Sequence, residues 1–205
     1  MNILMCAATQ MELTHVISDH HQIDYLVTGA GSPSTCYHLT RQFSNRLPAL
    51  AIQIGIAGTY DENLPLGSVI QVRSDLFSDL GAQDAMGNFI PLSQLVTQDF
   101  PFGLDRLLPY RRLVLDHLVE VDGITVNTVH GHLPDILKIK QAGFAGIETM
   151  EGAAFFATCM AFDMPCVQLR AISNRVEPRN REAWQIPLAL NNIHQVVKQF
   201  IEQLA

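Results

Sequence analysis

The stretch IETMEGAAFFATCMAF, from Ile147 to Phe162, decides how the rest of the chain is interpreted. A short apolar run passes there into good helix formers with apolar residues on almost every side, which predicts a nearly buried helix. Glu148 and Glu151 stand at this junction. A carboxylate at the first turn of a buried helix is costly to desolvate unless it accepts hydrogen bonds from free helix N–H groups or from a ligand. Glu151 is therefore a candidate site residue, although both acids can instead simply complement the helix dipole.

Short apolar runs alternate with helical segments along the chain, which predicts an α/β fold. We expect one domain over residues 1–205, with three α/β/α layers around a central mixed, largely parallel sheet. Gly and Pro punctuate residues 73–110, which predicts irregular connections there. The predicted strands are 2–7, 25–28, 49–56, 67–72, 165–172 and 118–129, the last as one or two strands with a bend at Asp122 and Gly123. Besides the central helix, four helices are predicted. The first follows Thr9, and the second has Ser32 as its N-cap and Pro33 as its first residue. The third covers residues 132–142 and stops at Gly143, and the last runs from Pro187 to near Leu204.

The composition argues against several classes of function. A chain of 205 residues with 48% apolar residues is long enough for one substantial core. Its formal net charge of -7, without runs of like charge, argues against nucleic acid or an anionic membrane surface as a partner. No apolar stretch reaches membrane-spanning length, and the first apolar run lacks the basic leader of a secretory signal. The four cysteines show no CxxC spacing, so we expect reduced thiols in a cytoplasmic protein that binds small molecules.

Polar residues and glycines gather where the predicted strands end. Glu12 follows the first strand, the GIAG segment Gly55–Gly58 ends another, and Ser173 and Asn174 follow the last. In open α/β sheets such strand ends converge on one ligand-binding crevice. Local explanations also exist, because TQME, which ends at Glu12, is a capping box, and the glycines can simply form a turn.

Other motifs are weaker. The GAGSPS segment, which starts at Gly29, resembles half of a dinucleotide-binding GxGxxG motif but lacks the third glycine and a partnered acid. His130 and His132 form an HxH pair, whereas a zinc site needs three or four ligands and no others are evident. HExxH and GxSxG are absent from the sequence. We therefore expect no cofactor and no metal.

Four features together resemble the purine nucleoside phosphorylase and methylthioadenosine nucleosidase superfamily. They are Glu12 after the first strand, GIAG, the METGA-like segment Met150 to Ala154, and RAISN from Arg170 to Asn174. The likeness runs along nearly the whole chain, and the last two motifs are the specific ones. The resemblance implies a nucleoside phosphorylase-like fold, cleavage of an N-glycosidic bond, and a dimer or larger homo-oligomer.

The resemblance also implies roles for single residues. The acid at Glu12 would activate the attacking water, and Met150 with Glu151 would hold the ribose, with Glu151 accepting from its hydroxyls. The backbone at Val126 would border the base. These roles make chemical sense, because cleavage passes through an oxocarbenium-like sugar that one carboxylate can stabilise while another deprotonates water.

One departure from the family pattern bears on the base. Nucleosidases that act on adenine nucleosides carry RAISD, whose acid bonds the base, whereas this chain carries Asn174. An amide can donate to a carbonyl O6 while its oxygen accepts from a protonated N7, and an ionised Asp cannot donate. A buried mismatch costs about 1–3 kcal/mol per polar group. Asn174 therefore favours a 6-oxopurine, hypoxanthine or guanine.

That departure and the segment from Ile172 to Trp184 resemble the futalosine hydrolases of this superfamily, which release hypoxanthine from futalosine in a menaquinone pathway. Futalosine carries a benzoate-type carboxylate arm on the ribose 5′ side. Arg175, Arg179 and Arg181 offer partners for the carboxylate, and Trp184 offers an aromatic face. Exposed arginines usually face water, so we expect one of the three to touch the substrate.

The nucleophile is expected to be water. A phosphorylase needs arginines around the glycine loop to bind phosphate, and GAGSPST has none. The alternatives are a 6-oxopurine nucleoside phosphorylase and a nucleoside-binding protein without turnover. The predicted catalytic residues are Glu12, Glu151 and Asn174, and the predicted substrate-binding residues are Ala57, Gly58, Val126, Met150, Ser173, Arg179 and Trp184.

Overall fold

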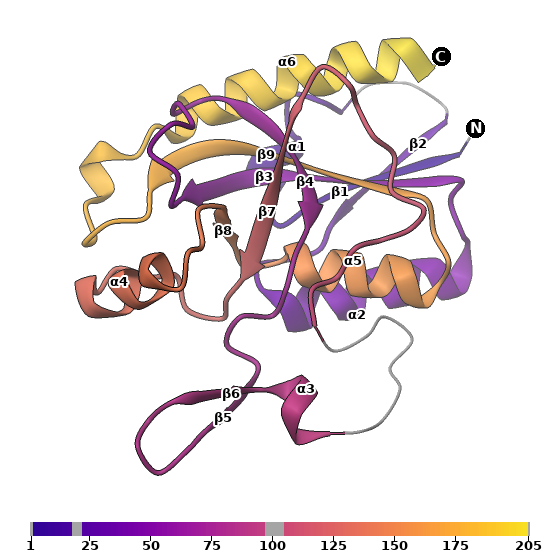
Figure 1. Cartoon of the computed structure of the whole chain (residues 1–205). Coiled ribbons are helices and arrows are strands. Elements are labelled where there is room, and N and C mark those ends of the chain that lie inside the picture. Colours follow the sequence, from indigo (N-terminus) through magenta and orange to yellow (C-terminus); the bar gives the residue numbers. More distant parts are fainter. Residues whose placement is uncertain (1, 18–21, 97–104, 205) are drawn as a thin grey trace.

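The computed structural model describes residues 2–17, 22–96 and 105–204 and arranges them as a mixed β-sheet with helices on both faces (Figure 1). The strands are β1 (Ile3–Ala7), β2 (Ile23–Val27), β3 (Leu50–Thr59), β4 (Val69–Ser74), β5 (Gly81–Gln83), β6 (Phe89–Pro91), β7 (Val119–Thr125), β8 (Ile147–Thr149) and β9 (Cys166–Arg175). The helices are α1 (Gln10–Leu13), α2 (Ser32–Asn45), α3 (Leu92–Leu95), α4 (Leu133–Gln141), α5 (Gly152–Ala161), the 3-10 helix η1 (Arg181–Ala183) and α6 (Ile186–Leu204).

The large sheet has the strand order β2-β1-β3-β8-β7-β4-β9. β9 also pairs with β3, so that β3, β8, β7, β4 and β9 form a closed ring of pairings from which β1 and β2 extend. The β3–β8 and β4–β9 pairings are antiparallel and the other five are parallel. The predicted mixed, largely parallel sheet is confirmed. Its partial closure brings the ends of β3, β8 and β9 together.

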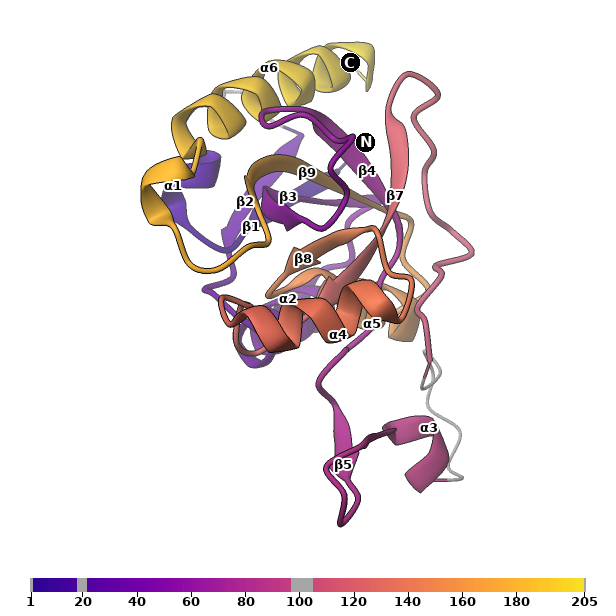
Figure 2. The same ribbon diagram turned by 60° about the vertical axis from the view of Figure 1, so that its left-hand side comes forward.

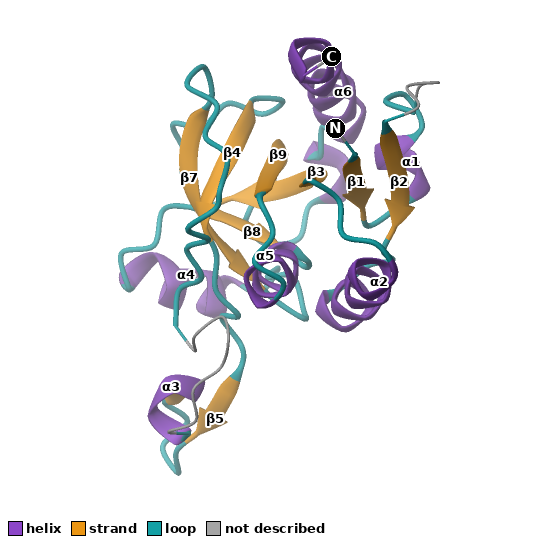
Figure 3. Cartoon of the chain, turned by 90° about the vertical axis from the view of Figure 1, so that its right-hand side faces the viewer, coloured by secondary structure: helices purple, strands orange, loops and turns teal. Residues whose placement is uncertain are grey.

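Helices cover both faces of the sheet (Figure 3). On one face, Leu13 of α1 and Ile193 of α6 belong to one buried apolar cluster. On the other, Leu39 of α2 and Phe155 of α5 belong to a second. The predicted three layers are therefore confirmed. The β5–β6 hairpin and α3 project away from this body (Figure 2).

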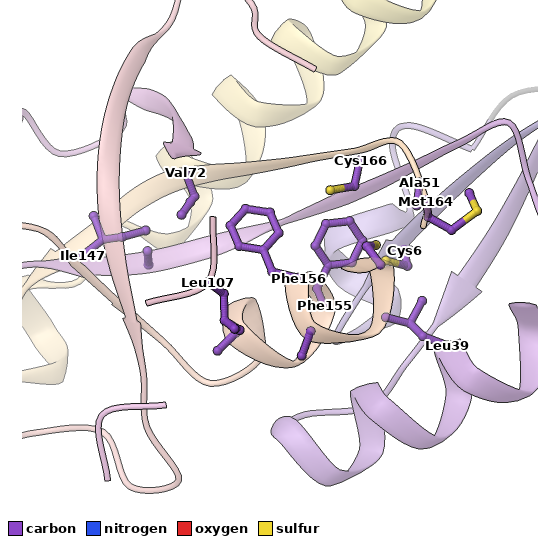
Figure 4. Packing of buried hydrophobic residues seen from close by; sticks show 14 of the residues in the cluster. Cys6, Leu39, Ala51, Val72, Leu107, Ile147, Phe155, Phe156, Met164 and Cys166 are labelled. Carbon is purple, nitrogen blue, oxygen red and sulfur yellow. The ribbon is translucent and has the colours of Figure 1, made fainter. Parts of the chain in front are cut away.

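Helix α5 is the buried helix that its sequence predicts. Eight of its ten residues are buried, and Phe155 and Phe156 are fully inaccessible to water. The two rings pack between the sheet, at Val72 and Cys166, and Leu39 of α2 (Figure 4). Truncating a buried Phe to Ala typically costs about 3–5 kcal/mol. This packing fixes the position of Glu151, which immediately precedes the helix.

Two segments for which a turn or bend was one alternative lie inside strands. β3 continues through GIAG to Thr59, and β7 continues through Asp122 and Gly123 without a bend. The glycines of GIAG serve close packing instead of a turn, because a Cβ added at Gly58 would lie 3.1 Å from Asn174 Nδ2 on the neighbouring strand. At Asp122 the side chain accepts hydrogen bonds from Ser74 and Arg73 of β4, and the register of the β4–β7 pairing shifts there.

Several boundaries also differ. β9 runs on to Arg175, so Ser173 and Asn174 lie inside a strand and not after it. Gly31, with a positive φ of 87°, is the N-cap of α2, and Ser32 is its first helical residue. Between residues 73 and 110 the chain forms β5, β6 and α3, where irregular connections were expected, and residues 97–104 lie outside the described part. The four cysteines are free thiols, as expected.

Candidate active site

A cavity of about 400 Å³ opens where β3, β8 and β9 end and α1 and α5 begin. Nine of the ten predicted site residues line it. They are Glu12, Ala57, Gly58, Met150, Glu151, Ser173, Asn174, Arg179 and Trp184. The exception is Val126, which is 1% exposed and whose N–H donates to the Thr149 carbonyl, while Val129 lines the cavity instead. Seven of these nine come from junctions or strand ends that the sequence singled out, Arg179 and Trp184 come from the loop after the last strand, and the structure brings all nine together.

Glu12 takes part in the capping box of α1 and also lines the cavity. One carboxylate oxygen, Oε2, accepts from the backbone N–H of Thr9 at 2.9 Å and from its hydroxyl at 2.8 Å, which confirms the capping box. The other oxygen, Oε1, accepts from the N–H of Ile56 in β3 at 3.3 Å. The side chain lines the cavity although only 7% of the residue is exposed. The cap therefore holds the carboxylate in place at the cavity wall.

Glu151 forms its side-chain hydrogen bond outside α5. It is the N-cap residue of α5, yet its carboxylate accepts no hydrogen bond from that helix, all of whose residues the structure describes. Instead Oε1 accepts from the N–H of Gly31 at 2.9 Å, and the adjacent Ser32 hydroxyl donates to the Met150 carbonyl at 3.2 Å. The GAGSPS loop thus holds Met150 and Glu151 through these two hydrogen bonds.

Arg170 is a site feature that the sequence analysis did not single out. Its guanidinium is 1% exposed, donates to Gln53 Oε1 at 2.8 Å and to Gln168 Oε1 at 3.2 Å, and lies 3.7 Å from Glu151 Oε2. A Cβ added at Gly55 would lie 2.3 Å from Arg170 Nη1 and 2.9 Å from Glu12 Oε1. Gly55 therefore leaves the space in which this cation approaches the acids. An arginine within the apolar run PCVQLRAI was the available signal, because a buried charge needs partners.

Asn174 stands beside Gly58 with half of its hydrogen-bonding capacity in use. Its Oδ1 accepts from the Ser173 hydroxyl at 2.8 Å, and its Nδ2 donates to the Arg175 carbonyl at 2.8 Å. A carboxamide offers two N–H donors and two acceptor lone pairs. One donor and one acceptor of Asn174 therefore have no partner among the described residues and can serve a ligand in the cavity.

The three arginines of the 172–184 segment separate in the structure. Arg175 donates to the carbonyls of Asp61 and Glu62 and so holds a loop. Arg181 is exposed on η1 and does not line the cavity. Arg179 lines the cavity and lies 5.6 Å above the Trp184 ring, a cation–π contact. One arginine of three lies at the cavity.

Glu148 also lines the cavity and is tied to two ring side chains. Its carboxylate is 5% exposed and accepts from the Tyr60 hydroxyl at 2.8 Å and from the backbone N–H of His130 at 2.9 Å. The hydrogen bond between Glu148 and the His130 ring raises the pKa of that imidazole. His132 pairs with Asp135 on α4. No metal-binding cluster of His, Cys, Asp and Glu occurs among the described residues, so the HxH pair is part of ordinary ion pairs.

Beneath the start of α5 lies a buried carboxyl group. Asp75 Oδ1 accepts from the Thr125 hydroxyl at 3.0 Å, and Thr125 Oγ1 in turn accepts from the Ala153 N–H of α5 at 2.7 Å. Asp75 Oδ2 finds no hydrogen-bond partner among the described residues. Burial raises the pKa of Asp75 to about 7. This group supports the helix start that carries Glu151.

Comparison with known proteins points to one enzyme family. The family model of the phosphorylase superfamily matches residues 121–202. The chain is 25% identical over 194 residues to a futalosine hydrolase of Thermus thermophilus, covering 87% of this chain and 81% of that protein. It is 32% identical over 180 residues to a futalosine hydrolase of Acidothermus cellulolyticus, covering 83% and 71%.

A solved structure confirms the fold. The 5′-methylthioadenosine/S-adenosylhomocysteine nucleosidase of Helicobacter pylori superposes with a TM-score of 0.79 over 98% of both chains, at 14% sequence identity. Within the described residues, none of the helices has the length and apolarity needed to cross a membrane.

Proposed function

The chain belongs to the futalosine hydrolase family of the phosphorylase superfamily, and we propose that it hydrolyses the N-glycosidic bond of futalosine. The products are hypoxanthine and the sugar that keeps the 5′ arm, a step of menaquinone biosynthesis. The observation that supports this proposal most strongly is the convergence of Glu12, Glu151 and Asn174 on one cavity from three separate parts of the chain.

Each of these three side chains has its own role in the reaction. Glu12 accepts a proton from the attacking water as the water oxygen bonds to C1′ and the bond from C1′ to N9 breaks. Glu151 accepts from the ribose hydroxyls and stabilises the positive charge that develops on the sugar. General base catalysis of this kind contributes about 10²- to 10⁴-fold to the rate. Glu12 is suited to it because Thr9 and Ile56 orient its carboxylate without filling its acceptor capacity.

Asn174 selects the leaving base. Its free N–H donates to O6 of hypoxanthine. N7 takes up a proton from solvent as the bond to N9 breaks, so that the base leaves neutral, and the free oxygen lone pair of Asn174 accepts from this N7–H. Gly58 supports this role, because any Cβ there would crowd the amide. The strand on which Asn174 lies is buried over most of its length, and the amide is held by the Arg175 carbonyl and the Ser173 hydroxyl.

The remaining lining residues divide between the sugar and the arm. Met150 lies beside Glu151 against the ribose, with Ala57, Gly58 and Ser173 forming the wall behind it. Trp184 offers a ring to the aromatic arm, and Arg179 stands over that ring. This arrangement supports a substrate that continues past the ribose 5′ carbon.

Water is favoured over phosphate as the nucleophile. The buried cation near the acids, Arg170, already donates to Gln53 and Gln168 and pairs with Glu151. A phosphate dianion needs cations that are free to compensate it. Arg170 could compensate a phosphate beside the acids only by giving up its pairing with Glu151.

We propose that the protein assembles as a homo-oligomer. The family resemblance supports a homo-oligomer, a dimer or larger, of a single domain over residues 1–205, and free cysteines suit a cytoplasmic protein. Size-exclusion chromatography with light scattering tests the oligomer, for which a monomeric mass would contradict the proposal.

An activity assay tests the proposed reaction. Purified protein is incubated with futalosine, inosine or methylthioadenosine, each with and without phosphate, and released bases are separated by chromatography. We expect hypoxanthine from futalosine at a rate independent of phosphate, and nearly no adenine from methylthioadenosine. A requirement for phosphate would show a phosphorylase, and preference for methylthioadenosine would refute the role of Asn174. Binding of futalosine without cleavage would show a binding protein.

A further inference from the structure

A second hollow adjoins the active-site cavity. It measures about 650 Å³ and lies between α1 and α6. Met11, Ile186 and Leu190 line both hollows, so they form the boundary between the two. A ligand that leaves the cavity across this apolar boundary enters what we call the α1–α6 groove.

The groove changes character along its length. On α6, Ile186, Leu190, His194 and Lys198 all line it at intervals of four residues, which places them in one row on one helix face. The row runs from two apolar residues at the cavity to two basic ones beyond. The groove is therefore apolar next to the active site and basic at its far end.

The basic end includes a residue from α1's side of the groove. His15 follows Met11 by four residues and lines the groove with its ring centroid 5.3 Å from that of His194. His15 and Lys198 are exposed, whereas His194 is buried and its Nε2–H donates to the backbone carbonyl of Glu12 at 2.8 Å. The basic end therefore backs directly onto the segment that carries the proposed catalytic base.

The basic end of the groove has no acidic side chain among the described residues that line it. The chain has 20 acidic against 13 basic residues, yet all ten described residues that line the groove are neutral or basic. Lys198 forms no ion pair within the described part of the chain, although Glu202 lies one turn further along α6. Burial lowers the pKa of His194, and the nearby His15 and Lys198 lower it further. An exposed lysine without an ion-pair partner among the described residues, beside an exposed imidazole at the end of an apolar channel, is suited to an anion.

We propose that the α1–α6 groove binds the 5′ arm of the substrate, with the arene on the apolar boundary and its carboxylate on Lys198 and His15. This inference rests on the proposed function and names the anion-binding residues of the same substrate. An aromatic group suits the boundary formed by Met11, Ile186 and Leu190. A carboxylate suits the ammonium and imidazole groups beyond it. Arg179, over Trp184, would then hold the near part of the arm and not its charged end.

A charge-deletion experiment tests the groove. KM and kcat are measured for futalosine and for an analogue whose arm carboxylate is a primary amide, with wild type, Lys198→Met and His15→Gln. The matched control is Lys138→Met, because Lys138 is an exposed lysine on α4 that pairs only with Asp135 among the described residues. For Lys198→Met we expect KM for futalosine to rise about fivefold, the upper range for an exposed ion pair, with kcat little changed. KM for the amide analogue should stay the same.

The outcomes separate the two proposals. A merely structural role of Lys198 would change both substrates equally, and an unchanged ratio of their KM values in Lys198→Met and His15→Gln would overturn the groove. So would a carboxylate-specific loss in Arg179→Met alone. If wild type releases no hypoxanthine at all, the proposed function fails. Calorimetric binding of futalosine and its amide analogue to the same variants then decides whether the groove binds the arm.

Discussion

Replacing Asn174 by Asp changes one atom at the position that we assign to base selection. In the structure the Nδ2 of Asn174 donates to the Arg175 carbonyl at 2.8 Å, and Oδ1 accepts from the Ser173 hydroxyl at 2.8 Å. An ionised Asp keeps the bond from Ser173. Its second oxygen faces the carbonyl oxygen of Arg175 and cannot donate to O6 of the purine.

The substitution lowers both the catalytic efficiency on futalosine and the stability of the fold. The lost bond to O6 costs about 1–3 kcal/mol in the transition state, which lowers kcat/KM for futalosine about 5- to 150-fold. The lost bond to the Arg175 carbonyl costs about 1 kcal/mol of folding stability, a fall of about 2–4 °C in melting temperature for a chain of this size. For the 6-amino analogue of futalosine kcat/KM should rise, because the carboxylate accepts from the exocyclic amine.

Base release from futalosine and from its 6-amino analogue measures this change in base preference. Hypoxanthine and adenine are separated by chromatography for wild type and for Asn174→Asp, and the ratio of the two kcat/KM values is compared. Asn180→Asp is the matched control, since Asn180 is an exposed residue of the following loop. An equal loss on both nucleosides, with the ratio unchanged, would refute base selection by Asn174 and leave it a structural residue.

Three further predictions concern the groups around the cavity. Glu12→Gln should stay folded and melt about 2–4 °C below wild type, because Gln also serves in a capping box but its amide nitrogen cannot accept from the Ile56 N–H, and it should lose about 10²- to 10⁴-fold in kcat; retained activity with a lowered melting temperature would show that only the cap matters. Gly55→Ala should destabilise the fold by about 1–3 kcal/mol in urea unfolding and lower kcat in the folded fraction, because the new Cβ meets Arg170 and Glu12; unchanged kcat would contradict the placement of these two side chains. The third concerns Asp75, whose pKa is about 7 in the folded protein and about 3.9 in the unfolded chain. The folded state therefore binds the proton more tightly, which favours folding at low pH. This contribution to the unfolding free energy is lost as pH rises through about 4 to 7. Relative to Asp75→Asn, wild type should lose on the order of 4 kcal/mol of unfolding free energy between about pH 4 and pH 8, and parallel curves for the two proteins would contradict the raised pKa.

The sequence predicts the elements of this fold well where local pattern decides them. The apolar composition of α5 and the capping box that ends at Glu12 are both confirmed, and so is the C′ glycine after α4, Gly143, with a φ of 80°. Strand ends were less predictable. The segments GIAG and Ser173 to Asn174 punctuate the chain as turns do, but tertiary pairing of β3 with β9 extends both strands through them.

Contacts between distant residues were not predictable from local pattern. Arg170 meets Glu151 and Gln53 across the sheet, the latter 117 residues away in sequence. The hydrogen bonds of Glu148 to Tyr60 and His130 likewise depend on the closed ring of strands. The sequence indicates candidate residues by their chemical type and by their position between a strand and a helix. The fold determines which of them share a cavity.

A crystal structure of Glu12→Gln with futalosine bound tests the central claim most directly. We predict that O6 and N7 of the base lie within about 3.2 Å of the Asn174 amide and the ribose hydroxyls within the same distance of the Glu151 carboxylate. A base that turns away from Asn174, or a sugar whose hydroxyls do not reach Glu151, would contradict the account.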